Sequence, residues 1–117
     1  MTLRGERNID GQLPPEVLQQ SATLMAMLAA TVRLHILWLL TIEDRDVTTL
    51  ATLTDQSTPT VSHHLSKLKL SGIVNDRRSG RQRIYFITNE RVSDIVRLAV
   101  ESSDMWPQTA KRRTKFA

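Results

Sequence analysis

One helix-forming stretch, residues 57–74, constrains the fold of this chain of 117 residues more than any other. Three apolar residues recur there at i, i+4 and i+7, the spacing of a helix stripe that packs on a core: Val61, Leu65 and Leu68. Ser57 is suited to cap the N-terminus, Pro59 falls in the first turn, and Gly72 follows the C-terminus. The pattern predicts an amphipathic helix with one side anchored in a core.

The other side of this helix is polar and carries no acidic residue in its first half. Hydroxyl groups can bond either kind of base edge, and Thr methyls can meet thymine methyls. We therefore predict base contacts with double-stranded DNA from residues of the N-terminal half: Thr58, Thr60, Ser62, His63 and Lys67. For His64, closer to the packed side, we predict either a structural hydrogen bond or a phosphate contact.

A β-hairpin is predicted directly after the helix. Residues 73–74 begin an extended segment, Ser79-Gly80 is a turn signal, and residues 81–87 return as a β-branched and aromatic run. Before the helix, residues 47–54 place four apolar residues at helical spacing: Val47, Leu50, Ala51 and Leu53. This first helix is joined to the second through Asp55-Gln56. Two such helices and a hairpin predict a winged helix-turn-helix, a mainly α fold with a small β-hairpin.

Positive charge is concentrated on the helix end and the hairpin. Residues 67–83 hold six basic side chains against a single acid, Asp76. A basic hairpin beside a polar helix is suited to a phosphate backbone. We predict phosphate or minor-groove contacts from its arginines: Arg77, Arg78, Arg81 and Arg83. Arg78 and Arg81 flank the turn and are therefore best placed to reach DNA. Since strand residues alternate faces, not all four arginines can do so.

The spacing of these residues resembles the ArsR/SmtB family of bacterial winged-helix repressors. The family pattern V-x-x-L-A…S-x-x-x-V-S-x-H-L-x-x-L-x-x-x-G-(I/L)-V is matched at Val47, Leu50, Ala51, Ser57, Val61, Ser62, His64, Leu65, Leu68, Gly72, Ile73 and Val74. Upstream, residues 28–37 resemble the family's L-A-D-P-T-R-x-x-I-L, with Ala30, Thr31 and Val32 in place of Asp-Pro-Thr. The resemblance covers roughly residues 17 to 104, and it implies a homodimeric repressor.

The remaining helices are predicted on both sides of this motif. One begins at Pro14-Pro15-Glu16 and ends near residues 29–30. The next is capped by Thr31, with Ile36, Leu37 and Leu40 facing inward and Arg33 and His35 outward, and residues 43–46 form a charged turn after it. The last is capped by Asn89, is widened by Leu98 and Val100, and is ended by Pro107 shortly after Trp106.

The first and last helices are more apolar than a small core requires. The resemblance implies that they form a dimer interface, for which we predict Val17, Leu24, Val92, Ile95, Val96 and Ala99. A two-fold dimer predicts a palindromic operator with half-sites about 34–36 Å apart.

Three regions are expected along the chain: a flexible arm over residues 1–13, the winged domain over 14–106 and a basic tail over 107–117. The chain has no cysteine, and we see no signal peptide and no apolar run of about 20 residues. A cytoplasmic protein without a membrane segment is the expectation. Catalysis is not expected, because the consecutive Ser62, His63 and His64 diverge by about 100° per residue on a helix.

Metal sensing, which the family resemblance suggests, lacks its usual ligands here. The family's C-V-C-D-L pattern aligns with residues 46–50, which contain no thiol, and no histidine follows His64. The family's last-helix ligands align with Asn89, Arg91, Ser102 and Met105. We predict no metal and no cofactor, with the effector unknown. Two alternatives stay open: an atypical metal site from Asp94, Glu101 and Asp104, and a partner-controlled, antitoxin-like regulator.

Overall fold

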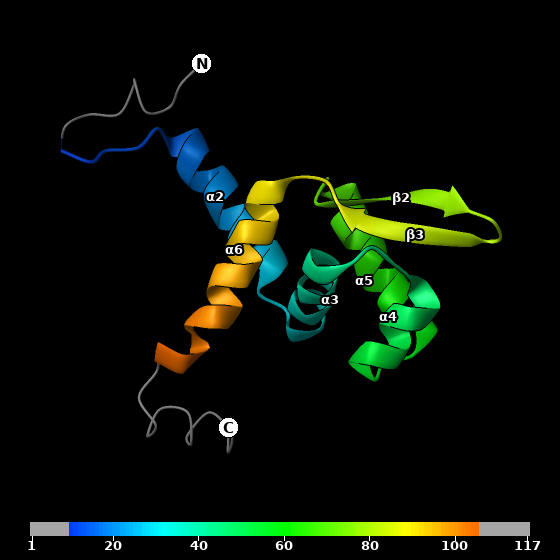
Figure 1. The fold of residues 1–117 in the computed structure, drawn as a ribbon. Coiled ribbons are helices and arrows are strands. Elements are labelled where there is room, and N and C mark those ends of the chain that lie inside the picture. The colour runs from blue at the N-terminus through cyan, green and yellow to red at the C-terminus, as the bar shows by residue number, and fades with distance from the viewer. Residues whose placement is uncertain (1–9, 106–117) are drawn as a thin grey trace.

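The computed structural model of the chain describes residues 10–105. Within that range the chain forms these elements (Figure 1): α2 (Pro15–Leu28), α3 (Thr31–Ile42), β1 (Arg45–Asp46), α4 (Val47–Thr54), α5 (Thr58–Leu70), β2 (Val74–Ser79), β3 (Gln82–Ile87), α6 (Glu90–Glu101) and the short 3-10 helix η1 (Ser102–Met105). The predicted mainly α fold with a β-hairpin is confirmed. Residues 1–9 of the predicted arm, and the basic tail with Trp106, lie outside the described residues.

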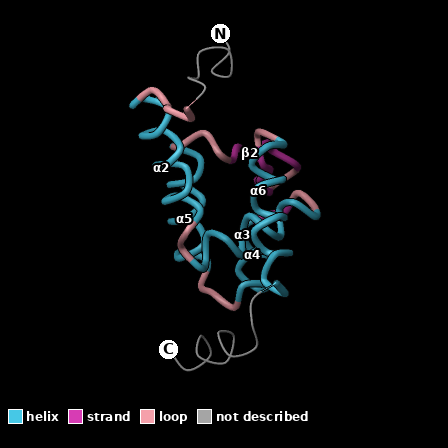
Figure 2. Tube along the Cα trace, turned by 90° about the vertical axis from the view of Figure 1, so that its left-hand side faces the viewer, coloured by secondary structure: helices cyan, strands magenta, loops and turns pink. Residues whose placement is uncertain are grey.

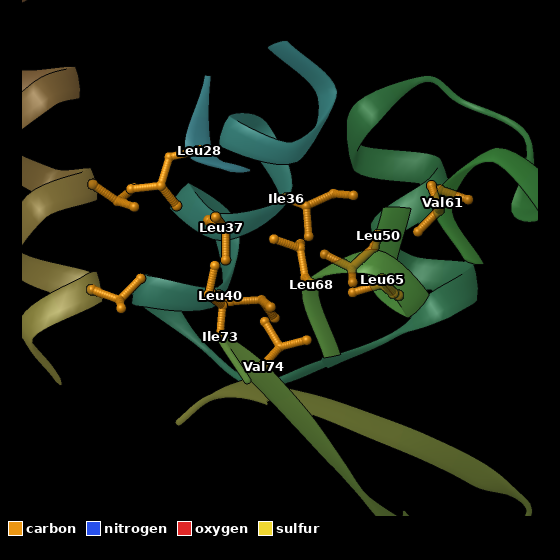
Figure 3. Close-up of a cluster of buried hydrophobic side chains, with 13 residues drawn as sticks. Leu28, Ile36, Leu37, Leu40, Leu50, Val61, Leu65, Leu68, Ile73 and Val74 are labelled. Atoms are coloured by element: carbon orange, nitrogen blue, oxygen red, sulfur yellow. The ribbon is translucent and has the colours of Figure 1, made fainter. Parts of the chain in front are cut away.

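The core is built from aliphatic side chains that come from all five α-helices of the described range and from the start of β2 (Figure 3). Eight of its members are less than 2% exposed: Ile36, Leu37, Leu50, Val61, Leu65, Leu68, Val74 and Val96. Burial of one such side chain contributes roughly 1.5–3 kcal/mol. The predicted apolar stripe of α5 therefore lies wholly inside the core, and so do the inward residues predicted for α3.

The turn between α4 and α5 joins them as the sequence predicts. Asp55 ends α4 in the left-handed conformation at φ 57°, which a short polar side chain tolerates better than a bulky one. The N–H of Gln56 then donates to the carbonyl of Ala51 at 3.0 Å. Thr54 is buried, and its hydroxyl donates to the carbonyl of Leu50 at 2.7 Å. These bonds satisfy carbonyls at the end of α4 and set the direction of α5.

A third strand joins the predicted hairpin. Arg45 and Asp46, which the sequence places in a charged turn, form the short strand β1 and pair antiparallel with β3, opposite Tyr85 and Ile84. The strand order is β1-β3-β2. Two charged residues are too short a run to show strand periodicity, because strand signals need about four residues. The pairing ties the hairpin to the N-terminus of α4.

The helix ends agree with the predictions in part. The Ser57 side chain accepts from the N–H of Thr60 at 3.2 Å, and the Asn89 side chain accepts from that of Arg91 at 2.8 Å, as predicted caps do. Thr31 is not a cap: Ala30 occupies that position, without a side-chain bond. The last helix ends at Glu101 rather than near Trp106. At this end the Ser102 hydroxyl donates to the carbonyl of Leu98 at 2.6 Å.

Two leucines predicted on apolar faces lie outside the core. Leu53 of α4 is 44% exposed and Leu98 of α6 is 68% exposed. Each sits at the margin of its stripe, where helix spacing alone does not separate a core position from a surface position. Both remain available as apolar surface.

Helix α2 is packed less closely than the others. Its only buried residue is Leu28, and the large side chains of Leu18 and Met25 are 60% and 58% exposed. In Figure 2, α2 lies to the left and α6 with β2 to the right. Among residues 10–105 no single helix is long and apolar enough to cross a bilayer, and the pair α2 and α3 reaches that length only with a bend of 90°.

Candidate nucleic-acid interface

The exposed side of α5 carries the residues predicted to read bases. Since Val61, Leu65 and Leu68 point into the core, the opposite face of the helix turns outward. Thr58, His63 and Lys67 are exposed, whereas Thr60 and Ser62 are half-buried. The Ser57 hydroxyl donates to the Thr60 hydroxyl oxygen at 2.8 Å, which leaves the proton of Thr60 available for another acceptor. The start of α5 thus presents a fixed row of short polar groups.

The two adjacent histidines of α5 have different surroundings. His63 is exposed, and its ring meets that of His64 edge-on at 5.8 Å between centroids. The Nδ1 atom of His64 is buried without a hydrogen-bond partner among the described residues, so the structural bond predicted for it is not found at that atom. Burial lowers the pKa of His64, and nearby Arg33, His63 and Lys67 lower it further. The neutral imidazole is therefore favoured.

The hairpin of β2 and β3, which we call the wing, extends past α4 and α5 (Figure 1). Its register places Arg78 directly opposite Arg83 and Ser79 opposite Gln82. Gly80 in the connecting turn has φ 64°, a value that favours glycine. Two guanidinium groups that face each other across a ladder repel, and a nearby anion reduces that repulsion.

Arg77 is held on the outer face of the wing by two contacts. Its Nη1 donates to Asp44 Oδ2 at 2.9 Å, and its guanidinium lies over the Phe86 ring at 5.7 Å from the centroid. Asp44 lies in the segment between α3 and β1, so this pair joins the wing to the body of the domain. Both partners are partly exposed, which limits its contribution to below about 1 kcal/mol.

Asp76 of β2 is an anion that lies beside these cations. Its side chain is only 2% exposed, and its two oxygens take different cations, Lys69 Nζ at 2.7 Å and Arg83 Nη1 at 3.0 Å. The hydrogen bond from Lys69, with the charges of Lys69 and Arg83, outweighs burial and lowers the pKa of Asp76. Charge patterning along the sequence identifies this acid without assigning it a role. Asp76 lies two residues after buried Val74, so both are on the same strand face, and this spacing could have indicated that Asp76 is buried.

The four wing arginines are therefore not equivalent. Arg77 and Arg83 are engaged by Asp44 and Asp76, although both were predicted as DNA contacts. Arg78 and Arg81 are exposed and form no salt bridge within residues 10–105. Arg78 and Arg81 flank the turn, which is the position that the sequence favours for contact with DNA.

The predicted dimer-interface residues divide into two groups. Val92 and Val96 are 8% and 0% exposed within the single chain, so they belong to its own core and offer no surface to a partner. Val17, Leu24 and Ile95 are half-buried and Ala99 is exposed. Helix periodicity could not separate these groups, because α6 packs one side of its stripe on α3.

An apolar hollow of about 270 Å³ lies where α3 meets the end of α6. It is lined by Thr31, Leu34, His35, Trp38 and Val100. His35 is exposed, as predicted. In the part of the chain that the structure describes, no three His, Cys, Asp or Glu side chains gather closely enough to hold a metal ion. Asp94, Glu101 and Asp104 are each exposed.

A core-anchored helix preceded by a short helix and followed by a two-stranded wing defines the class of winged helix-turn-helix DNA-binding proteins. The sequence model of the bacterial regulatory protein, arsR family, matches residues 31–76, from α3 into β2. The transcriptional regulator KmtR of Mycobacterium tuberculosis is 33% identical over 92 residues, which cover 79% of this chain and 71% of KmtR. The chain belongs to the ArsR family.

Other relatives agree with this assignment. The transcriptional repressor SmtB of Mycobacterium tuberculosis is 37% identical over 87 residues, covering 74% of this chain and 64% of SmtB. The homodimeric winged helix-turn-helix DNA-binding domain of Mb0332 from Mycobacterium bovis, solved by NMR, superposes with a TM-score of 0.68. It is 36% identical in sequence, with 76% of this chain and 82% of that domain covered.

We predict that Asp76→Asn lowers the free energy of unfolding by about 1–2 kcal/mol at pH 7, since the change removes a buried carboxylate that pairs with two half-exposed cations. Because the pKa of Asp76 is lowered from its ordinary value of 3.8, its stabilisation is present above pH 3.8 and lost as the pH falls through the lowered pKa. Urea denaturation from pH 7 to about pH 3 should show the difference from wild type shrinking.

The matched control for this measurement is Asp94→Asn. The Asp94 carboxylate is 72% exposed and pairs with Arg97 at 3.3 Å, so the change should cost less than about 0.5 kcal/mol at any pH. A loss for Asp76→Asn that is the same at both ends of the pH range would contradict an electrostatic role.

Proposed function

We propose that this chain is a homodimeric transcriptional repressor that binds a palindromic operator in double-stranded DNA and blocks a promoter, in the cytoplasm. The observation that carries the proposal is the combination of one exposed polar helix face with two arginines on the adjacent wing, Arg78 and Arg81, that form no salt bridge within residues 10–105. Helix α5 is rigid because its other face is fully buried. A rigid helix with short polar side chains at its N-terminal half is suited to the major groove.

The helix and the wing have separate tasks in this proposal. Thr58, Thr60, Ser62, His63 and Lys67 contact base edges, with His64 donating an N–H to a phosphate. Arg78 and Arg81 contact phosphates or the minor groove. Phosphate contacts position a protein on any duplex, whereas base contacts discriminate between sequences. Catalysis is no part of the proposal, since the adjacent His63 and His64 rings meet edge-on and form no nucleophile–base array.

To test this assignment, an operator is first selected from a random duplex pool with the purified protein. Changing Arg78 and Arg81 together to Ala should make the negative slope of log K against log salt shallower by about 0.9 for each phosphate no longer neutralised. The change should be equal on operator and scrambled duplex. Changing Thr60 to Val or His63 to Ala should instead reduce discrimination between the two, by roughly 1–3 kcal/mol per good base contact. Fluorescence anisotropy on both duplexes measures these quantities.

The control for the wing is Arg97→Ala, which removes an exposed arginine of α6 that is hydrogen-bonded to Thr41 of α3. It should leave the salt slope unchanged. If all the helix and wing changes reduced binding to both duplexes equally, the division between base reading and phosphate contact would be wrong. Failure of the wild type to select any sequence would refute the proposed function.

The dimer is proposed to form through the apolar surface that α2 and α6 leave uncovered. Leu18 and Met25 of α2 and Leu98 of α6 are each more than half exposed, and the hollow between α3 and α6 adds to this surface. Large exposed apolar side chains mark interaction sites. Because a two-fold interface would bury each changed residue twice, once on each subunit, charge is poorly tolerated there.

We predict that Leu98→Asp converts the dimer to a monomer and weakens operator binding, without loss of fold, because Leu98 lies outside the core. Light scattering measures the mass and circular dichroism the helix content. The matched control is Leu70→Asp, since Leu70 of α5 is 91% exposed and lies outside the proposed interface. A dimer of unchanged stability after Leu98→Asp would place the interface elsewhere.

The effector is proposed to be something other than a thiolate- or imidazole-bound metal. Tight sites for zinc-like ions use Cys and His at converging positions, and this chain has no Cys and three His. His35 lies on α3 and the other two on α5, where they are expected to face DNA.

Isothermal titration with Zn²⁺, Ni²⁺, Co²⁺ and Cd²⁺ should show no stoichiometric binding tighter than about 10 μM, which corresponds to roughly −7 kcal/mol. Structural zinc sites reach about 10–16 kcal/mol. Submicromolar binding that released the operator would contradict the prediction. Changing Asp94, Glu101 and Asp104 to Asn or Gln would then test the atypical site.

A further inference from the structure

Asp76 stands alone as an acid in the basic segment of residues 67–83. A carboxylate on a DNA-facing wing would repel phosphates if it were exposed and unpaired. Here the side chain is 2% exposed, and each oxygen has its own cation. The carboxylate therefore acts on its two neighbours rather than directly on DNA.

The two cations come from different elements. Lys69 lies in the last turn of α5 and Arg83 on β3, while Asp76 is on β2. In the strand register Asp76 is opposite Tyr85, so Arg83, two residues before Tyr85, lies diagonally across on the same face. The bridge thus joins the end of the recognition helix to both strands of the wing.

The same bridge decides which charges remain available. Arg83 is directly opposite Arg78, and both lie on the face that carries Asp76. Asp76 neutralises Arg83 and leaves Arg78 without a salt bridge in the described range. Lys69 and Arg83 are each about half exposed, at 51% and 54%, so both side chains have the solvent access to reach a phosphate once released.

We infer that Asp76 is a positioning residue that determines DNA specificity: it holds Lys69 and Arg83 away from phosphates and fixes the wing relative to α5. The inference rests on the proposed function. Released cations would bind phosphates on any duplex, because phosphate contacts carry no sequence information. The operator complex gains less affinity from the released cations than a random duplex does. Base reading needs α5 and the wing in one relative position, and the bridge through Asp76 sets that position.

The test compares Asp76→Asn, Arg83→Gln and the double variant with wild type, on the selected operator and on a scrambled duplex of equal length. In Asp76→Asn the salt slope on scrambled DNA should steepen by about 0.9 per released cation, which is up to about eightfold in affinity for each cation at 0.1 M salt. The ratio of operator to scrambled affinity should fall. Arg83→Gln alone should leave the slope unchanged. In the double variant the slope should be shallower by about 0.9 than in Asp76→Asn, because the released Arg83 is no longer present.

Two controls separate this effect from charge and from folding. Asp94→Asn changes the net charge equally but lies on α6, and it should alter neither the slope nor the ratio. Circular dichroism and thermal melting report whether each variant is folded. Should Asp76→Asn fail to fold, the single variants Lys69→Gln and Arg83→Gln test the inference. Because Asp76 keeps both cations away from phosphates, neither variant should change the salt slope.

An unchanged or shallower slope in Asp76→Asn would overturn the inference. So would a slope that is shallower by about 0.9 in Arg83→Gln alone, since Arg83 would then contact a phosphate while it is paired with Asp76. In either case wild-type selection of an operator would leave the proposed function standing. A wild-type protein that bound no duplex would overturn both.

Discussion

The burial of one face of α5 is the constraint on which the rest of the structure depends. Val61, Leu65 and Leu68 are completely buried, and they lie in one cluster with core residues of the other α-helices and of β2 (Figure 3). A helix held in this way cannot rotate without exposing three aliphatic side chains, at a cost of several kcal/mol. Its opposite face is therefore presented in one orientation, as sequence-selective contact with a groove requires.

The wing depends on electrostatics more than on packing. Beyond Val74 and Ile87, its outer part consists mostly of charged and polar side chains, and its arginines are arranged by two acids from different places in the chain. Asp44 engages Arg77 on one face, and Asp76 engages Arg83 on the other. Such pairs contribute little to stability when exposed, but they decide which positive charges are available. The distribution of charge on the wing is thus a property of the folded chain.

Much of the fold could be predicted from local patterns, and the exceptions have physical reasons. The stripes of α3 and α5, the caps at Ser57 and Asn89 and the hairpin turn at Gly80 each depend on residues close in sequence. Strand β1 was missed because its pairing partner lies far along the chain, on β3, and two charged residues carry no periodic signal. The family resemblance implies a dimer interface on the apolar face of α6, but periodicity does not identify what covers each residue of that face, and Val92 and Val96 lie in the core.

By itself the sequence determined the helix-turn-helix, the hairpin after it, the basic character of the wing and the polar face of α5, since these follow from residue type and spacing along a regular backbone. Only the tertiary structure decided that α6 packs Val92 and Val96 inward, that His64 Nδ1 is buried without a partner among the described residues, and that Asp76 takes Lys69 and Arg83. The reason is that burial and ion pairing depend on distances between elements. Those distances are set when the whole core closes around α5, not by the neighbours of each residue in the chain.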